Sequence, residues 1–267
     1  MKRSILLVIA LLAGQTQAQP LTIFDTHLHY NSDARQHLST EEVIQTLKDA
    51  NITQVLVSST DDAGTQLLVE AAPTLFLPAL RPYRRAGETK TWMYDPSVID
   101  HLESKLAQNN YLALGEFHAF EEHIQLPVVQ AMVDLARQHN LVLHHHGDYG
   151  AVEALYESWP QARLLWAHAG FEEPDTVRLA LQRYPNLWVD LSHRPDISTW
   201  AGLALNWSML FEEFPERFVL GSDTYTLERW QKVGFYALDA RDWLSVLPDE
   251  VAQNIAYRNA QRLFDLD

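Results

Sequence analysis

The sequence predicts an α/β fold of the (β/α)8, or TIM, barrel class, and three observations carry this prediction. Short apolar segments alternate with longer amphipathic ones, which is the pattern of parallel strands joined by crossover helices. There are about eight such apolar segments, and a chain of 267 residues has the usual length for a barrel. Candidate metal ligands stand at or just beyond the ends of strands one, four, five, six and eight, and active sites of barrels lie at that face.

An open, doubly wound parallel sheet is the alternative fold. In an open sheet the first and eighth strands can lie far apart, whereas in a barrel they are neighbours. His27 at the end of the first strand and Asp223 at the end of the eighth share one metal ion only if the sheet closes. The positions of these residues therefore favour the barrel.

The first half of the chain supplies four strands with helices between them. Apolar runs of strand length cover residues 21–25, 53–58, 73–80 and 111–116. The acidic turn at 39–42 begins an amphipathic helix, because carboxylates in a first turn complement the helix dipole. Residues 61–71 form the next helix, and Asp95-Pro96 opens one that runs to Leu106.

The second half repeats this pattern. Helices are expected over 127–139 and 149–158, and Pro174 marks another helix start because proline is favoured in a first helical turn. Strands are expected over 141–146, 162–168, 186–192 and 217–223. A closing helix is expected over 248–264.

The N-terminal residues 1–18 have the features of a secretory signal peptide. Lys2 and Arg3 precede an apolar run at 5–13 that is too short to span a bilayer, and small residues near Ala18 suit cleavage. We therefore expect a single (β/α)8 domain over residues 19–267 in the periplasm or the secreted fraction. The absence of cysteine excludes a lipoprotein anchor and a disulfide framework.

The charge of the chain argues against a nucleic-acid substrate. Removing Lys2 and Arg3 from the 20 basic side chains leaves 18 against 35 acidic ones, a formal charge of −17. Such a surface repels a polyphosphate backbone. We expect no membrane partner either, and a small molecule as substrate. The sequence does not indicate an oligomeric state.

His27 and His29 are the first candidate metal ligands. Side chains alternate along a strand, so these two imidazoles project to the same side and can grip one metal ion. Neutral imidazole binds zinc and also suits iron, nickel and copper. The spacing does not name the metal, and an isolated His-x-His pair also occurs by chance.

Together with the segments around the other strand ends, the chain resembles the amidohydrolase superfamily, particularly its amidohydrolase-related (amidohydrolase 2) branch. The matching segments are 24–29, 146–148, 165–170, 187–192, 218–223 and 259–264. The resemblance implies a metal-dependent hydrolase with a barrel fold and a divalent metal cofactor. Zinc is the favoured metal, with Mn²⁺ or Fe²⁺ as alternatives.

The resemblance also implies the ligand set, which is His27, His29, Glu116, His146, His168 and Asp223. Many relatives have a carboxylated lysine on the fourth strand, whereas the Gly-Glu found here is similar to TatD-like members. One or two ions therefore remain possible. His144 shares a strand face with His146 and is the alternative ligand, while His145 points to the other side.

Asp223 is expected to accept the proton of a water activated by the metal, since a divalent ion lowers the pKa of bound water to about 7. His168 either binds a second ion or polarises the carbonyl of the substrate. Arg81, His193 and Arg194 lie near the mouth and are candidate substrate-binding residues; an arginine there suits an anionic substrate. Arg84 and Arg85 are interpreted as solvated loop charges.

The function expected from these residues is hydrolysis of an amide, ester, lactone or phosphoester bond of a small molecule. Two alternatives remain. Relatives in the same branch use such a site for lyase chemistry, such as decarboxylation. A metal-binding protein without turnover is the other, but Asp223 argues against it because a structural metal site needs no proton acceptor.

Overall fold

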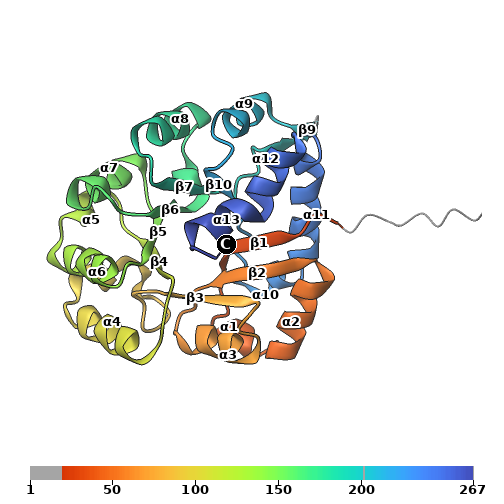
Figure 1. Ribbon diagram of the computed structural model, residues 1–267. Helices are drawn as coiled ribbons and strands as arrows, with labels where there is room; N and C mark the ends of the chain where they lie inside the picture. The colour runs from red at the N-terminus through yellow and green to blue at the C-terminus, as the bar shows by residue number, and fades with distance from the viewer. Residues whose placement is uncertain (1–19, 201, 267) are drawn as a thin grey trace, which may run out of the picture.

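The computed structural model describes residues 20–200 and 202–266, so the predicted signal peptide lies outside the described residues. Eight parallel strands form one sheet whose order follows the chain (Figure 1). They are β1 (Ile23–Leu28), β2 (Ile52–Val57), β3 (Phe76–Leu80), β4 (Ala113–His118), β5 (Val142–His146), β6 (Leu164–Trp166), β7 (Leu187–Asp190) and β10 (Phe218–Val219). Every expected strand is therefore present in the expected order.

The sheet closes because the chain after β10 returns to β1. Leu28 and Thr224 form a parallel bridge. The amide of Asp223 donates a hydrogen bond to the carbonyl of His27 at 2.7 Å. The prediction of a (β/α)8 barrel is thus confirmed, and the alternative prediction of an open, doubly wound sheet is wrong.

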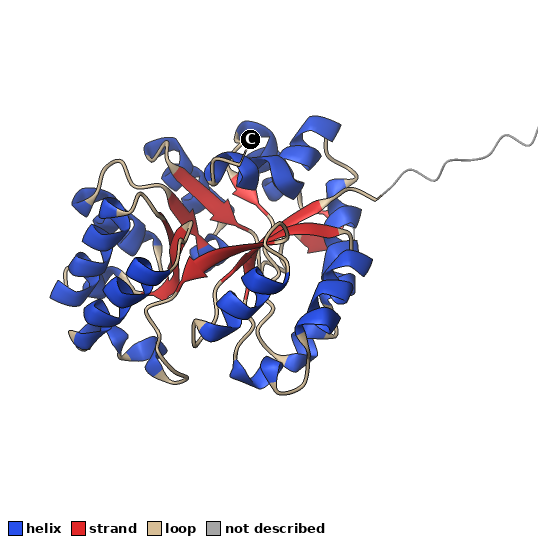
Figure 2. Ribbon diagram, turned by 60° about the horizontal axis from the view of Figure 1, so that its bottom comes forward, coloured by secondary structure: helices blue, strands red, loops and turns tan. Residues whose placement is uncertain are grey.

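Helices surround the barrel on the outside (Figure 2). The longer ones are α2 (Thr40–Asp49), α3 (Ala63–Ala71), α4 (Ser97–Gln108), α6 (Pro127–Gln138), α7 (Tyr149–Ser158), α8 (Pro174–Arg183), α9 (Leu205–Glu213) and α11 (Val233–Leu244). Short helical segments are α1 (Ser32–Arg35), α5 (Glu121–Ile124), α10 (Leu227–Trp230), α12 (Asp249–Gln253) and α13 (Asn259–Leu263), with a π turn at Asn254–Arg258 between the last two. Ser39 caps α2 through a reciprocal capping box with Glu42, as the acidic turn predicts.

The end of the barrel opposite the metal ligands is filled by apolar side chains. One buried cluster takes a residue from each of seven strands together with three from the C-terminal segment: Phe24, Leu56, Ala79, Ala113, Val142, Leu165, Val219, Ala260, Leu263 and Phe264. Figure 1 accordingly shows α13 and the C-terminus lying across the centre of the barrel. Among the described residues this cluster closes one end of the barrel, which leaves the other end, where the strands terminate, open to a substrate.

Strand β1 carries an irregularity that determines where its histidines point. Its register against β2 shifts between Asp25 and Leu28. Phe24 belongs to the interior cluster and Leu28 to the outer core. His27, three residues after Phe24, lies over the interior because the irregularity breaks the simple alternation.

Two strands and two of the longer helices differ from the sequence predictions. Strand β6 ends at Trp166, because His168 adopts a left-handed backbone conformation (φ 57°) in the turn that follows. Strand β10 is two residues long, since residues 220–223 leave it to reach β1. Helices α9 and α11 are not predicted; apolar residues such as Leu205 and Leu238 are exposed on them, which obscures the helical pattern.

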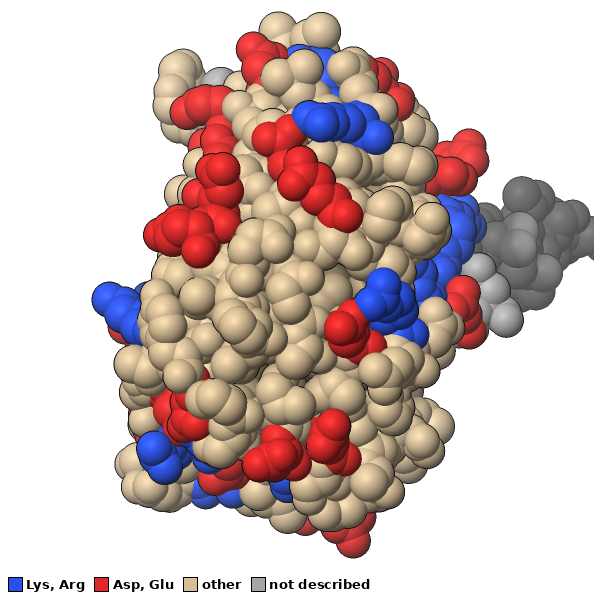
Figure 3. All heavy atoms as spheres, turned by 90° about the vertical axis from the view of Figure 1, so that its left-hand side faces the viewer, with Lys and Arg blue, Asp and Glu red and all other residues tan. Residues whose placement is uncertain are grey.

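The surface agrees with an acidic protein. Figure 3 shows the side that carries α5, α6 and α7, where acidic side chains outnumber scattered basic ones and no continuous basic patch is seen. Among the described helices, none has the length and apolar character needed to cross a membrane.

Candidate metal centre

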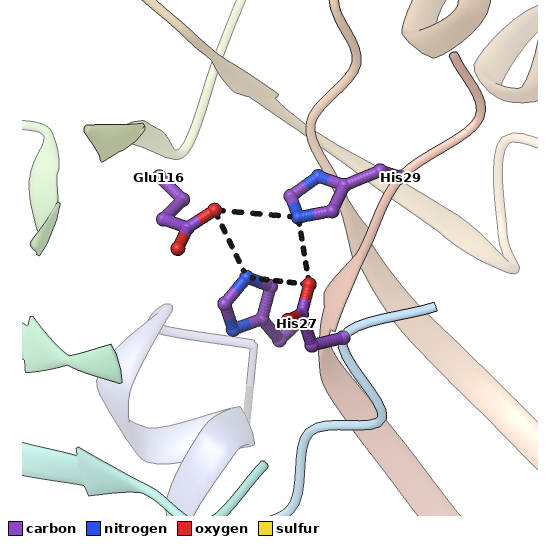
Figure 4. A group of neighbouring side chains, drawn as sticks. His27, His29 and Glu116 are labelled. Atoms are coloured by element: carbon purple, nitrogen blue, oxygen red, sulfur yellow. Dashed lines mark ion pairs between the residues drawn. The ribbon is translucent and has the colours of Figure 1, made fainter. Parts of the chain in front are cut away.

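Four buried side chains from three parts of the chain meet where the strands end. His27 and His29 come from β1 and the residue that follows it, Glu116 from β4 and Asp223 from the segment after β10. One ligand atom from each lies within 4.8 Å of the others. Figure 4 shows the two imidazoles and the Glu116 carboxylate pointing toward one another.

The distances between these atoms are those of groups arranged around a common point. Glu116 Oε2 lies 3.3 Å from His27 Nε2 and 3.4 Å from His29 Nε2. Asp223 Oδ1 lies 3.4 and 3.1 Å from the same two nitrogens. His27 Nε2 is buried and makes no hydrogen bond to any described residue.

The outer nitrogens of both rings face acceptors. His27 Nδ1 lies 2.7 Å from Asp190 Oδ2, and His29 Nδ1 contacts the carbonyl of Ser58. His29 Nδ1 also lies 3.2 Å from Arg81 Nη1, which can only donate, but its shorter contact is with the Ser58 carbonyl, which can only accept, and this contact favours a proton on Nδ1. This tautomer leaves the Nε2 lone pair free to bind a cation, which is the usual arrangement of metal-binding histidines.

The electrostatics of the centre favour a positive charge within it. Burial lowers the pKa of His27, but Asp223, Glu116 and Asp190 oppose this effect and raise the pKa well above 6.5. Burial raises the pKa of Glu116 and of Asp223, and the charge of His27 overrides it, so that both values fall well below the ordinary range. The three carboxylates are thus ionised around one imidazole.

These residues fit a divalent cation. Two imidazole nitrogens and two carboxylate oxygens are the ligand types that zinc accepts in tetrahedral sites. A buried nitrogen without a hydrogen bond and an excess of negative charge are what a cation would satisfy. The structure therefore supports a metal site at His27, His29, Glu116 and Asp223 without naming the metal.

His146 and His168 lie at the other oxygen of the same glutamate. Glu116 Oε1 is 2.7 Å from His146 Nδ1 and 3.6 Å from His168 Nε2. His118 stacks on His146 with ring centroids 4.0 Å apart and forms a second candidate metal group with His146 and Glu116. Glu116 thus presents one oxygen to each of two groups of histidines.

The comparison with known proteins follows from this geometry. A family model described as Amidohydrolase, of the amidohydrolase 2 type, matches residues 104–266. The chain belongs to this amidohydrolase family. The matched segment contains Glu116 and Asp223, while His27 and His29 precede it. None of the curated proteins compared with this amidohydrolase matches it.

Solved structures with low sequence identity share the fold of this amidohydrolase. An uncharacterized TIM-barrel protein from Bordetella bronchiseptica is 13% identical with a TM-score of 0.64, and the alignment covers 92% of this chain and 99% of that one. Amidohydrolase 2 from Bifidobacterium longum subsp. infantis is 14% identical with a TM-score of 0.59, over 92% and 100%. A probable 2-pyrone-4,6-dicarboxylic acid hydrolase from Acinetobacter baumannii, with citric acid bound, is 13% identical with a TM-score of 0.59, over 91% and 99%.

Family membership and the buried cluster together define the class of this enzyme. The chain has the fold of a metal-dependent hydrolase of the amidohydrolase superfamily and a metal-binding cluster where such a barrel holds its active site. A cavity of about 550 Å³ opens above the cluster, and His29, Glu116 and Asp223 are in its wall.

Two of the three predicted substrate-binding residues of the amidohydrolase are arginines that already pair with a neighbouring carboxylate. Arg81 donates to the Glu116 carboxylate at 2.9 Å and to its backbone carbonyl at 3.1 Å, and its side chain is only 8% exposed. Arg194 makes a bidentate pair with Asp196 and does not line the main cavity. Arg81 lines the main cavity while it holds the Glu116 carboxylate, and the substrate-binding roles of Arg81 and Arg194 stay predictions.

His193 lies in the main cavity beside Asp223. Its Nε2 is 2.9 Å from Asp223 Oδ2, and about a third of the side chain is exposed. His168, His193 and Asp223 all have positive φ angles of 57°, 55° and 44°. Such left-handed conformations are costly for residues other than glycine and cluster at functional sites.

His144 lies beneath His27 rather than beside the carboxylates. The two rings meet edge to face at 4.5 Å, and neither nitrogen of His144 has a hydrogen-bond partner among the described residues. Burial lowers the pKa of His144 well below 6.5, so its ring is uncharged and packs against His27. His145 points away and its Nε2 contacts the carbonyl of Ala119.

Three residues near the centre are not predicted from the sequence. Asp190 and Ser192 stand at the end of β7 and contact His27 and His168. Their segment, 187–192, is one of those that resemble the amidohydrolase superfamily, but the sequence analysis gives neither residue a role. A carboxylate at the end of a strand is the signal that could have identified Asp190. Arg85, interpreted as a solvated charge, lines the main cavity.

Gly221 gives a first prediction because two site residues occupy the space of a side chain there. A Cβ would lie 2.3 Å from Asp190 Oδ1 and 2.7 Å from His27 Cβ. We expect Gly221→Ala to lower the free energy of unfolding by about 1–3 kcal/mol, the usual cost of overpacking. Gly234→Ala is the control: no described atom lies within 4 Å of its Cβ, and alanine favours the helix there. Urea denaturation of both variants checks this, and equal stabilities would contradict it.

The pKa of His27 predicts how the metal-free protein responds to pH. Since this pKa is raised, the protonated ring contributes stability that is complete below pH 6.5 and is lost as pH rises through the raised value. The lowered pKa values of Glu116 and Asp223 contribute stability that is lost only in acid. We therefore expect the urea midpoint in chelator to fall as the pH rises above 6.5, and this fall to be weaker with saturating Zn²⁺. A midpoint that rises in chelator would show that His27 is neutral.

Proposed function

We propose that this amidohydrolase uses a divalent metal, preferably zinc, to hydrolyse an amide, ester, lactone or phosphoester bond of a small molecule that carries an anionic group. The observation that carries the proposal is the position of Asp223. One carboxylate oxygen faces His27 and His29, and the other faces His193 in the cavity. A purely structural metal site needs no carboxylate that reaches a substrate cavity in this way.

The roles of the residues follow from these contacts. His27, His29, Glu116 and Asp223 would hold the cation, which supplies an activated water near neutral pH and polarises the bond to be cleaved. Asp223 accepts the proton of the attacking water and delivers it to the leaving group. His193 holds the second oxygen of Asp223 and thereby directs the carboxylate toward the cavity.

The cavity also supports a small anionic substrate. Arg85 lines it, and its side chain is 75% exposed. Its ionic partner Glu88 lies 3.2 Å away but is already paired with Arg84 at 2.9 Å. Arg84 also pairs with Asp95 at 2.6 Å, so Arg85 is the exposed cation of a group of two arginines and two carboxylates. The similar structure from Acinetobacter baumannii, which holds citric acid, is consistent with an anionic ligand in such a barrel.

A substrate screen tests the proposed reaction. The purified protein, freed of metal and then supplied with Zn²⁺, Mn²⁺ or Fe²⁺, is incubated with panels of amides, esters, lactones and phosphoesters, each with neutral and anionic members. We expect turnover that requires metal and favours anionic members. Release of CO₂ from carboxylic acids without hydrolysis would replace the proposal with a lyase, and digestion of single-stranded DNA would overturn the small-molecule class.

Arg85 gives a prediction for any anionic substrate found in the screen. Replacing Arg85 by alanine removes a charged hydrogen bond of about 1.5 kcal/mol, so KM should rise about tenfold with little change in kcat. A neutral substrate should be unaffected. Arg183→Ala is the control, since Arg183 pairs with Glu153 on the outer helices. Steady-state kinetics decides, and an equal effect on both substrates would exclude Arg85 from binding the anion.

We also propose export of the protein through the segment 1–18, with its positive start and apolar run. Expression of the full chain in a bacterium, followed by fractionation and N-terminal sequencing, tests this. A mature protein that begins near residue 19 in the periplasm is expected.

A further inference from the structure

We propose that Asp190 and Ser192, at the end of β7, act together as a positioning pair that fixes the ring tautomers of His27 and His168. The pair would leave the Nε2 lone pairs of both rings free on the side of Glu116, where a cation would be held. Its effect on turnover rests on the proposed function, whereas its effect on the rings does not. Neither residue lines the main cavity, so both act through the histidines.

The contacts form one continuous chain between the two rings. Asp190 Oδ2 lies 2.7 Å from His27 Nδ1 and 2.6 Å from the hydroxyl of Ser192. The same hydroxyl lies 2.8 Å from His168 Nδ1 and 3.2 Å from His27 Nδ1. Asp190 is fully buried and Ser192 is 2% exposed, so water does not compete for these contacts.

The available donors and acceptors determine where the protons lie. The carbonyl of Ser192 is 3.1 Å from His168 Nδ1, and a carbonyl only accepts, so His168 donates from Nδ1. The Ser192 hydroxyl then accepts from His168 and donates its one proton to Asp190. The Asp190 carboxylate also accepts from His27, which places the proton of that ring on Nδ1.

The orientation of the Asp190 carboxylate is itself fixed. Its Oδ1 accepts from the backbone amide of Ser192 at 2.8 Å, which leaves Oδ2 for His27 and the Ser192 hydroxyl. Asp190 also lies in the β7–β10 ladder opposite Val219. A carboxylate held at both oxygens keeps the His27 ring in one rotation as well as one tautomer.

This arrangement makes Asp190→Asn a sharp test, because the backbone amide of Ser192 needs an acceptor. The backbone amide of Ser192 would hold the asparagine oxygen in the Oδ1 position, and the NH2 group would then face His27 Nδ1. His27 would then have to accept at Nδ1 and carry its proton on Nε2, which faces the cation site. We expect the affinity for zinc to fall about 100-fold. This is the upper end of the usual loss of affinity when the hydrogen-bond partner of a metal-binding histidine is replaced.

The first experiment compares ring nitrogens by ¹H–¹⁵N NMR of histidine-labelled protein at pH 8 and equal zinc concentration. In the zinc-loaded wild type, His27 and His168 should both be protonated at Nδ1. In Asp190→Asn, His27 should lose the Nδ1 proton, while His168 keeps its own through the Ser192 carbonyl. If His27 stays protonated at Nδ1 and zinc affinity stays within threefold of the wild type, the pair does not set the tautomer.

Ser192→Ala is the second variant and removes only one oxygen. His168 retains the carbonyl acceptor, so zinc affinity should change less than threefold, but the His168 Nδ1 resonance should shift and kcat/KM should fall about three- to tenfold. Ser158→Ala, on the outer helix α7, should leave all these values unchanged. An unshifted His168 resonance in Ser192→Ala would remove the hydroxyl from the pair. Normal ring and zinc behaviour without any substrate turnover would instead disprove the proposed function alone.

Discussion

Replacing Asp223 by asparagine is expected to lower kcat by about 10³-fold, within the range for loss of a general base. Asparagine has the same shape and keeps one oxygen that can face His27 and His29. It cannot take a proton from water at neutral pH. We therefore expect most of the bound metal to remain while turnover is lost, and the loss to persist when the metal is saturating.

The measurement pairs kinetics with metal analysis of the same sample. Activity is followed at saturating Zn²⁺ and saturating substrate, and bound zinc is counted after removal of excess metal. Asp242→Asn, an exposed carboxylate on α11, serves as control and should behave like the wild type. If Asp223→Asn retains a tenth or more of kcat, another group takes the proton, and His193 would be the next residue to test.

The sequence could predict the barrel because its signals are local and regular. A strand buried on both faces is mostly apolar, so the segments 55–57 and 141–143 within the predicted strands stand out from the helices between them. Closure could be inferred because Asp223 and His27 need a common metal. The backbone contact between these two residues shows how directly the closed sheet joins them.

The parts that escaped prediction depend on three-dimensional partners. Arg81 and Arg194 both follow strand ends, and sequence position alone does not reveal that each guanidinium is already engaged by a carboxylate. Asp190 is distant from His27 in the chain, and only the neighbouring positions of their strand ends make them a hydrogen-bonded pair. Arg85 lines the cavity, whereas the neighbouring Arg84, which looks equivalent in the sequence, pairs with Glu88 and Asp95.

The left-handed residues show a further limit. The expected sixth strand runs through His168, although alternation from the interior residue Leu165 would place that side chain on the outer face of the barrel. The structure ends the strand two residues earlier and brings His168 to the centre through a turn with positive φ. Nothing in the residue types of an Ala-His-Ala-Gly segment requires this conformation except the glycine. Tertiary contacts with Ser192 and the packing of Phe171 on the His168 ring support it instead.

Glu116→Gln is expected to abolish metal binding at ordinary concentrations and to destabilise the protein. Glu116 contacts both candidate ligands of β1 through one oxygen and His146 and His168 through the other. The neutral amide of glutamine lacks the negative charge that balances a bound cation. Its NH2 group would also replace an acceptor oxygen on one side, facing either the two histidines at β1 or His146 and His168. Loss of a partner behind a ligand costs about 10–100-fold in affinity, so loss of the ligand itself should cost at least about 100-fold.

The stability change has a separate cause, the buried guanidinium of Arg81. Its Nη2 donates to Glu116 at 2.9 Å, and with glutamine the positive charge is left without a carboxylate. Removing one partner of a buried ion pair costs about 3–5 kcal/mol, which urea denaturation in chelator should detect.

Glu88→Gln is a matched control for this experiment. Glu88 is also a buried carboxylate paired with arginine, but it contacts Arg84 and Arg85 rather than the metal centre. It should lower stability and leave zinc affinity unchanged. If Glu116→Gln also keeps its zinc, the carboxylate of β4 is not a ligand. The cation would then depend on His27, His29 and Asp223 alone, a set of three protein ligands with one position open.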